Sequence, residues 1–241
     1  MLTTVALFAV LSAGCADEAG EAQPDQADEL PPASTSASDL AALESPHVDT
    51  PVQNEFVHVH AIDLPSGEGL SPHEGGPRVI YTLAPYRVAF DTDGMSETAS
   101  FSAGEVHEHD AGVHTVENVG DSTASFVIFE RREAALPSAG PEGETAVPSP
   151  SEGAEERVVF EGGHAQVHRV TLDPGARLPE HRGHARAIHS LNSYTVEFTG
   201  DSGTREQSFE RGDAHYHDPG EHTVVNVGDG AAEFLIVEFT R

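Results

Sequence analysis

The chain has 241 residues, with 41 Asp and Glu residues against 12 basic residues and a formal net charge of −29 at pH 7. All of these basic residues are arginines, so Schiff-base chemistry by lysine is excluded. A surface of this charge repels phosphate backbones, which disfavours nucleic acid as a partner. The single cysteine, Cys15, has no second cysteine with which to form an intramolecular disulfide.

Residues 1–15 carry a short apolar run, Val5 to Leu11, and then small residues that end at Cys15. The run is too short to span a bilayer and has the length of a signal-peptide core. The Leu-Ser-Ala-Gly-Cys ending resembles the lipobox of bacterial lipoproteins, although no Lys or Arg precedes the run. The resemblance implies cleavage before Cys15 and a membrane anchor of several acyl chains on it, which holds a protein stably.

Ala16 follows the cysteine, which is similar to lipoproteins of the outer membrane. We therefore expect an exported protein, lipid-anchored at Cys15 to a bacterial membrane, the outer membrane facing the periplasm. The alternative is a plain secretory peptide with a chance cysteine.

Two segments lack hydrophobic periodicity. Residues 16–52 are rich in Asp, Glu, Ala, Ser and Pro, and residues 133–157 have a similar composition. Such segments cannot bury enough apolar surface to fold. We expect a disordered acidic tether over 16–52 and a flexible linker over 133–157. These leave two folded domains, at 53–132 and 158–241.

The two predicted domains are copies of one module. Residues 104–130 recur at 212–238, an offset of 108 positions that holds from Phe56 to Glu130 without insertion or deletion. A repeat of this kind decides the domain organisation before any other signal. Five histidine pairs survive in the two copies: His60 with His168, His73 with His181, His107 with His215, His109 with His217, and His114 with His222.

Each copy is predicted to be a series of short strands. Tyr194, Val196 and Phe198 alternate with polar residues, a period of two that is typical of antiparallel strands. The runs 126–129 and 234–237 are continuously apolar, as in a strand buried on both faces. Gly- and Asp-marked turns separate the strands. The pattern predicts an all-β fold with a small barrel or sandwich in each copy.

The second copy carries Gly212, five residues, Asp218-Pro219-Gly220, then His222 and Asn226. This resembles the second sequence motif of the cupins, and the first copy has the same pattern at 104–118, one residue short before the histidine in both. The first cupin motif is only partly present. Gly67 with His73, and Gly175 with His181, fit its opening, but glycines stand at the second metal position, Gly75 and Gly183. The resemblance implies a bicupin, two tandem double-stranded β-helix (jelly-roll) barrels.

Cupins usually hold a divalent metal with three histidines and a glutamate inside the barrel. Two of those four ligands are present in each copy, His73 with His114 and His181 with His222. Histidines two apart on a strand share one sheet face, so His109 and His217 could complete three-histidine sets. His184 could add a ligand in the second copy only. Such sets suit iron, zinc, manganese or nickel, and they make the second copy the better metal candidate.

The glutamate position of the cupin motif falls on Arg78 and Arg186. A cation at that position repels a metal, and both copies keep it. An arginine there could instead form a bidentate pair with a carboxylate or phosphate. The residues therefore also predict ligand binding by Arg78 with His109 in the first copy and Arg186 with His217 in the second.

Three hypotheses follow for the function. The first is a binding protein for a small molecule, with an anion as one option, in the barrels. The second is a metal-dependent cupin enzyme of the dioxygenase or isomerase type, with the second copy active. The third is a structural or partner-binding protein whose histidines are idle. Cupins commonly dimerise, so a homodimer and a pairing of the two barrels within one chain are alternatives at this stage.

Overall fold

A computed structural model of the chain describes residues 37–92, 95–137 and 151–240. The predicted leader with Cys15, residues 16–36 of the predicted tether and residues 138–150 of the predicted linker lie outside this range. No helix in the part of the chain that the structure describes has the length and apolar character needed to cross a membrane.

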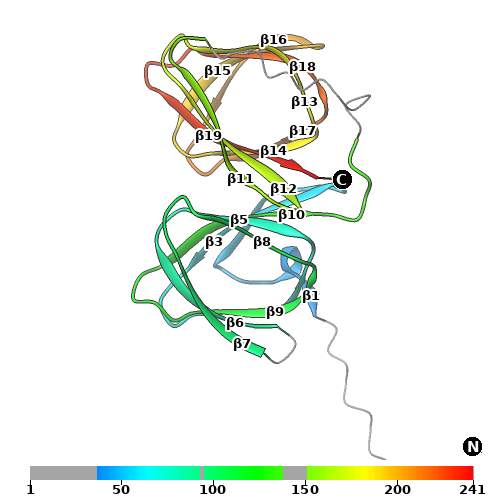
Figure 1. Ribbon diagram of the computed structural model, residues 1–241, viewed down its shortest axis with the longest axis vertical. Coiled ribbons are helices and arrows are strands. Elements are labelled where there is room, and N and C mark those ends of the chain that lie inside the picture. The colour runs from blue at the N-terminus through cyan, green and yellow to red at the C-terminus, as the bar shows by residue number, and fades with distance from the viewer. Residues whose placement is uncertain (1–36, 93–94, 138–150, 241) are drawn as a thin grey trace, which may run out of the picture. The chain divides into compact units, whose positions relative to one another are not determined.

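Each repeat folds into a barrel of two facing β-sheets, and Figure 1 shows its strands curving around an interior. The strands of the first repeat are β1 (Ser38–Asp39), β2 (Val48–Gln53), β3 (Val57–Leu64), β4 (Gly69–Gly75), β5 (Arg78–Thr82), β6 (Tyr86–Thr92), β7 (Met95–Phe101), β8 (Val106–His109), β9 (Gly112–Asn118) and β10 (Ala124–Arg131). Their sheet orders are β1-β4-β9-β6-β7 and β2-β3-β10-β5-β8.

The second repeat copies this arrangement except for β1, which has no counterpart. Its strands are β11 (Ala154–Glu161), β12 (Ala165–Leu172), β13 (Arg177–Gly183), β14 (Arg186–Ser190), β15 (Tyr194–Gly200), β16 (Gly203–Phe209), β17 (Ala214–His217), β18 (Gly220–Asn226) and β19 (Ala232–Phe239). Their sheet orders are β11-β12-β19-β14-β17 and β13-β18-β15-β16. Every strand from β3 to β10 recurs 108 residues later with both ends preserved. The predicted fold, two tandem cupin-like jelly-roll barrels, is therefore what the structure shows.

The segment just before the first repeat differs from the prediction. Residues 37–52 were expected to belong to a disordered tether, yet they contain β1, β2 and a short 3₁₀ turn, Leu40–Ala42. Leu40 is only 2% exposed and packs into the core of the first barrel with Ile62 and Leu70. The segment is stable because it adds strands to sheets that already exist, which composition alone does not reveal. The predicted linker also ends early, since β11 begins at Ala154.

A bulge in one strand of each barrel sets a histidine opposite the motif histidine of the neighbouring strand. The pairing of β4 with β9 shifts register between Leu70 and His73, and β13 shifts against β18 at the matching place, between Leu178 and His181. Proline occupies the bulge in both barrels, where a strand can accept a residue without an N–H. The shift sets His73 opposite His114, and His181 opposite His222. Bulges commonly re-aim a side chain in this way.

Each barrel has an apolar interior, and a third apolar cluster joins the two repeats. That cluster contains Val79 and Phe129 of the first repeat and Ala187 and Leu235 of the second. It explains the continuous apolar runs of β10 and β19, because alternate residues of these strands face the barrel interior and the shared cluster. The two barrels therefore pack within one compact unit, Ser36–Arg241, rather than standing as independent domains.

A buried asparagine closes the same turn in both barrels. The Asn226 side chain is fully buried, and its Nδ2 donates to the carbonyl oxygens of Leu172 and Gly230, each at 2.8 Å. Its Oδ1 accepts from the Gly228 backbone N–H at 3.0 Å. Asn118 makes the same three contacts in the first barrel. The motif asparagine thus ties the end of β9 to the end of β3, and the end of β18 to the end of β12.

Candidate functional site

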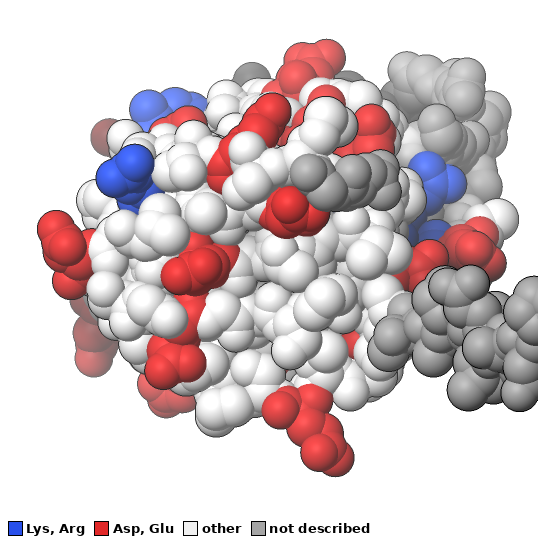
Figure 2. Space-filling view, turned by 90° about the horizontal axis from the view of Figure 1, so that it is seen from below, with Lys and Arg blue, Asp and Glu red and all other residues white. Residues whose placement is uncertain are grey.

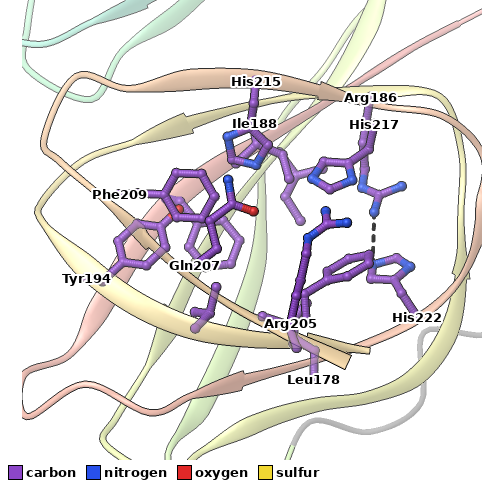
Figure 3. A pocket seen from close by; sticks show the side chains of 15 residues that line it. Leu178, Arg186, Ile188, Tyr194, Arg205, Gln207, Phe209, His215, His217 and His222 are labelled. Atoms are coloured by element: carbon purple, nitrogen blue, oxygen red, sulfur yellow. Dashed lines mark hydrogen bonds between the residues drawn. The ribbon is translucent and has the colours of Figure 1, made fainter. Parts of the chain in front are cut away.

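Each barrel encloses a cavity lined by inward-facing side chains of both its sheets (Figure 3). The histidines at this cavity are His73, His107, His109 and His114 in the first barrel and His215, His217 and His222 in the second. Phenylalanines flank several of them. His215 stacks on Phe209 with ring centroids 4.4 Å apart, and His107 stacks on Phe101 at 4.0 Å. Four of the five duplicated histidine pairs thus contribute to a barrel interior in at least one copy.

A buried arginine contacts the motif histidine inside each barrel. Arg186 is 3% exposed, and its Nη2 donates to His222 Nε2 at 2.9 Å, the contact dashed in Figure 3. Its Nη1 donates to the His184 carbonyl oxygen at 2.9 Å. In the first barrel, Arg78 Nη2 donates to His114 Nε2 at 3.2 Å. The imidazole nitrogen that would face a metal is therefore occupied by a guanidinium in both barrels.

Two glycines provide the space for these guanidinium groups. A Cβ placed on Gly75 would lie 2.7 Å from Arg78 Nη1 and 3.3 Å from His114 Cε1. At Gly183 a Cβ would meet Arg186 more closely still, and would lie 2.9 Å from His222 Cε1. Real Cβ atoms do not approach other atoms this closely. Gly75 and Gly183 therefore leave free the space that the guanidinium groups of Arg78 and Arg186 occupy.

The metal that cupins usually hold does not fit these two interiors. A divalent ion at His114 or His222 would face a guanidinium at hydrogen-bonding distance, without the carboxylate that normally balances its charge. Neither predicted three-histidine set brings its ligand atoms within 4.8 Å of one another among the residues that the structure describes. His181 Nδ1 instead donates to the Pro179 carbonyl oxygen at 2.8 Å. His181 and His184 are not among the residues that line the second cavity.

Burial fixes the charges in the second cavity. Desolvation, with the neighbouring Arg186, lowers the pKa of His217 to about 2 and that of His222 to about 3. Desolvation also lowers the pKa of Arg186, to about 10, and Glu238 opposes this shift. At neutral pH the histidines are therefore uncharged while the arginine keeps its proton. The interior is a neutral, aromatic wall around one buried cation.

Both cavities are small. The free volume open to water-sized molecules is about 40 Å³ in the second barrel and about 50 Å³ in the first. A single water requires roughly 10–15 Å³ by this measure. Each interior therefore accommodates a few water molecules or a ligand of a few non-hydrogen atoms.

The second cavity has an arginine that the sequence reading did not include. Arg205 on β16 lines the cavity beside Gln207 and Phe209, and its guanidinium lies 4.7 Å from the centre of the Phe198 ring. Figure 3 shows its side chain pointing into the cavity between Leu178 and His217. The first barrel has Glu97 at this position. The sequence did carry a signal for Arg205. It is one of only 12 basic residues, it stands at an inward position of a strand, and the other copy has a glutamate there.

A second polar cluster lies in the first barrel at the start of β3 and the end of β10. Asp39, His58 and Glu130 place ligand atoms within 4.8 Å of one another and could hold a divalent metal. None of the three was a candidate from the sequence, where His58 reads as an ordinary strand residue. Only the fold brings Asp39, on the segment predicted to be disordered, beside the other two.

No protein-family model matches the chain, and no curated protein matches its sequence. Solved structures do match its fold. AerE from Microcystis aeruginosa is 15% identical with a TM-score of 0.60, covering 82% of this chain and 95% of that one. The Lactobacillus farciminis oxalate decarboxylase formate complex is 17% identical with a TM-score of 0.57, covering 77% of each chain.

Oxalate decarboxylase of Bacillus subtilis, in a structure described for its Mn(II) centres, is 17% identical with a TM-score of 0.56, covering 76% of this chain and 69% of that one. At these identities the likeness establishes the fold alone. Together with the strand order of both barrels, it defines the chain as a protein of bicupin fold. Within that fold, the paired arginine–histidine contact distinguishes this chain from a barrel with the usual cupin ligand set.

The buried histidines predict a loss of stability in mild acid. Burial is the largest cause that lowers the pKa of seven histidines from 6.5 to between about 2 and about 4 in the folded chain. Below pH 6.5 the unfolded chain binds protons that the folded chain does not, so stability falls as pH falls. Each such histidine contributes about 1.4 kcal/mol per pH unit. Urea unfolding should show the midpoint decreasing between pH 7 and pH 5; a midpoint that stays constant over this range would contradict the burial.

Proposed function

We propose that the protein binds a small carboxylate or a similar small oxyanion in its second barrel, between Arg186 and Arg205. The observation that carries the proposal is a cavity with two guanidinium groups and no acidic side chain among the residues that line it. Arg186 has Glu238 as its cross-strand neighbour but makes no ion pair with a carboxylate among the residues that line the cavity, and a bound anion would provide a direct partner. Guanidinium groups are also the side chains best matched to the geometry of a carboxylate.

The neutral histidines complete the binding site. Because His217 and His222 stay uncharged, the two arginines carry the positive charge of the site and the rings contribute polar atoms only. His222 Nε2 already accepts from Arg186, which holds the guanidinium plane in place. The anion therefore meets a cation whose position is set before binding, which lowers the cost of ordering the site.

The size of the cavity limits the ligand class. A free volume of about 40 Å³ accommodates formate or a comparably small anion without rearrangement. A two-carbon dicarboxylate requires the exposed Arg205 side chain to move, since that side chain forms one wall at the mouth. A solved structure of the same fold is described as a formate complex, which supports formate as the first probe.

The surface of the protein opposes anion entry from a distance. The net charge is −29, and the face in Figure 2 carries scattered Asp and Glu side chains with few arginines. Three acidic residues, Asp201, Asp218 and Glu221, lie at the mouth of the second barrel. Salt screens such repulsion over about 10 Å at 0.1 M. Binding should therefore be measured at fixed ionic strength.

The two barrels provide an internal comparison for this proposal. Replacing Arg205 by Glu gives the second barrel the residue that the first barrel carries at Glu97. In Arg205→Glu, the affinity for formate and oxalate should fall about tenfold or more, because a charge within a few ångströms of the anion is reversed. Calorimetric titration and thermal protection at constant ionic strength measure the change.

Arg182→Glu is the matched control. It makes the same change of net charge on the exposed face of β13, where the first repeat already has Glu74. Arg182 lies 3.8 Å from Glu221 and is not among the residues that line the cavity. Its affinity should stay within a factor of two or three of wild type, as expected for an exposed charge. Equal losses in both variants, or no binding by the wild-type protein, would refute the site.

We also propose that the protein is exported and held on a bacterial membrane through Cys15. The lipobox-like ending at Cys15 and the acidic segment after it support this proposal. Cys15→Ser should move the full-length protein from the membrane fraction to the soluble fraction when it is expressed in a bacterial host. Retention of Cys15→Ser in membranes after a high-salt wash would contradict the anchor.

A further inference from the structure

The first barrel contains a buried polar cluster that the anion site does not use. It is formed by His58 and His60 on β3, Glu130 on β10 and Asp39 on β1. The side chains of His60 and Glu130 are fully buried, and His58 is 6% exposed. The sheet pairing places His58 directly across from Glu130. Four groups that commonly bind metals therefore converge at one end of the barrel, where Glu130 is also the cross-strand neighbour of Arg78.

Three atoms of this cluster have no hydrogen-bond partner. They are His58 Nδ1, His60 Nε2 and Glu130 Oε2. His58 Nδ1 lies 3.9 Å from Asp39 Oδ1, and His60 Nε2 lies 4.0 Å from Glu130 Oε2. These separations are too long for hydrogen bonds. They are close to the spacing of about 3.4 Å that ligand atoms have around an ion held by bonds of about 2.1 Å.

The remaining atoms of the cluster are held in place from outside. Arg132 Nη2 donates to Asp39 Oδ2 at 2.8 Å, and Arg132 Nη1 donates to Glu130 Oε1 at 2.5 Å. The Ala41 N–H donates to Asp39 Oδ1 at 2.9 Å, and Thr50 Oγ1 contacts His60 Nδ1 at 3.0 Å. Asp39, Glu130 and His60 thus each have a partner outside the cluster, while His58 Nδ1 faces Asp39 without one. This outer set of contacts is the usual arrangement around metal ligands.

The cluster belongs to the first barrel only. The residue that matches His58 in the second repeat is Gln166, and the match of Glu130 is the less buried Glu238. In the second repeat, His168 is fully partnered, with its Nε2 2.8 Å from Gln166 Oε1 and its Nδ1 2.9 Å from Glu156 Oε1. The same position is therefore a closed network in one barrel and has orphaned atoms in the other.

We propose that Asp39, His58 and Glu130, with His60 beside them, form a site for a divalent first-row transition metal such as Zn²⁺ or Mn²⁺. Two imidazoles and two carboxylates suit such ions, and the two carboxylates balance the charge of the ion beside Arg132. The cluster opens to a cleft lined by Asp39 and His58 together with Glu55, Glu74 and Glu133. These acidic residues attract cations toward the site.

The ion would tie the amino-terminal segment to the barrel. Asp39 comes from β1, which pairs with β4 over two residues only. The other ligands come from the central strands β3 and β10. A metal that bridges them couples binding to the docking of β1, as metal sites that join separate segments do.

The test uses the purified full-length chain, stripped of metal by chelation and titrated with Zn²⁺ or Mn²⁺ alone. Wild type should bind one ion per chain, measured by elemental analysis after dialysis and by thermal protection. His58→Gln installs the residue of the second repeat and should weaken binding at least tenfold, and Asp39→Asn should do so as well. Zn²⁺ should also slow proteolysis at residues 37–47 in wild type but not in Asp39→Asn.

His168→Gln is the matched control, since it changes the partnered histidine of the second repeat and should leave metal affinity unchanged. Asp39 is partly exposed, so Asp39→Asn keeps the test decisive if His58→Gln does not fold. The proposal is overturned if wild type binds neither ion more tightly than about 1 mM. It is also overturned if both Asp39→Asn and a folded His58→Gln keep wild-type affinity, or if the control loses as much as they do.

Discussion

A buried guanidinium that donates to an imidazole nitrogen is the contact on which the interior of each barrel depends. Arg186 and Arg78 reach the motif histidines at 2.9 and 3.2 Å, from a strand position where cupins carry a carboxylate. The glycines at 75 and 183 remain small because the guanidinium lies against them. The histidines stay neutral because the site is desolvated and already positive. The buried arginine thus accounts for the space at the two glycines and adds to the effect of burial in lowering the histidine pKa values.

The duplication explains how two chemistries can coexist in one chain. Both barrels have the arginine–histidine contact. The contact was therefore present before the two copies diverged, or it arose separately in each copy. The later differences are local: Arg205 faces the second cavity where Glu97 stands in the first, and His58 and Asp39 add a polar cluster to the first barrel only. The anion site is therefore expected in one barrel and the cation site in the other. The apolar cluster that joins the repeats keeps both in one compact unit.

The fold could be predicted from the sequence because the signals for strands and turns are local and occur in both copies. A period of two in strands such as 194–198 and matching Gly-marked turns defined the strands, and the constant offset defined the two barrels. The same periodicity placed His107 and His109 on one face. The chemistry of the interior was less predictable. The position of Arg186 relative to the motif was clear, but only the three-dimensional structure shows its guanidinium against His222 Nε2. Asp39 and Leu40 were assigned to a tether because their stability comes from strands distant in sequence.

Nitrogen NMR of the histidine side chains tests the central claim most directly. If a guanidinium holds the place of the metal, His222 and His114 should remain neutral with the proton on Nδ1 from pH 8 to pH 6, a range in which the chain stays folded and an ordinary imidazole becomes mostly protonated. Their Nε2 signals should not change when Zn²⁺ is added. Titration of either ring near pH 6.5, or a shift of its Nε2 signal on binding of Zn²⁺, would show that the guanidinium does not hold that nitrogen and would contradict the account.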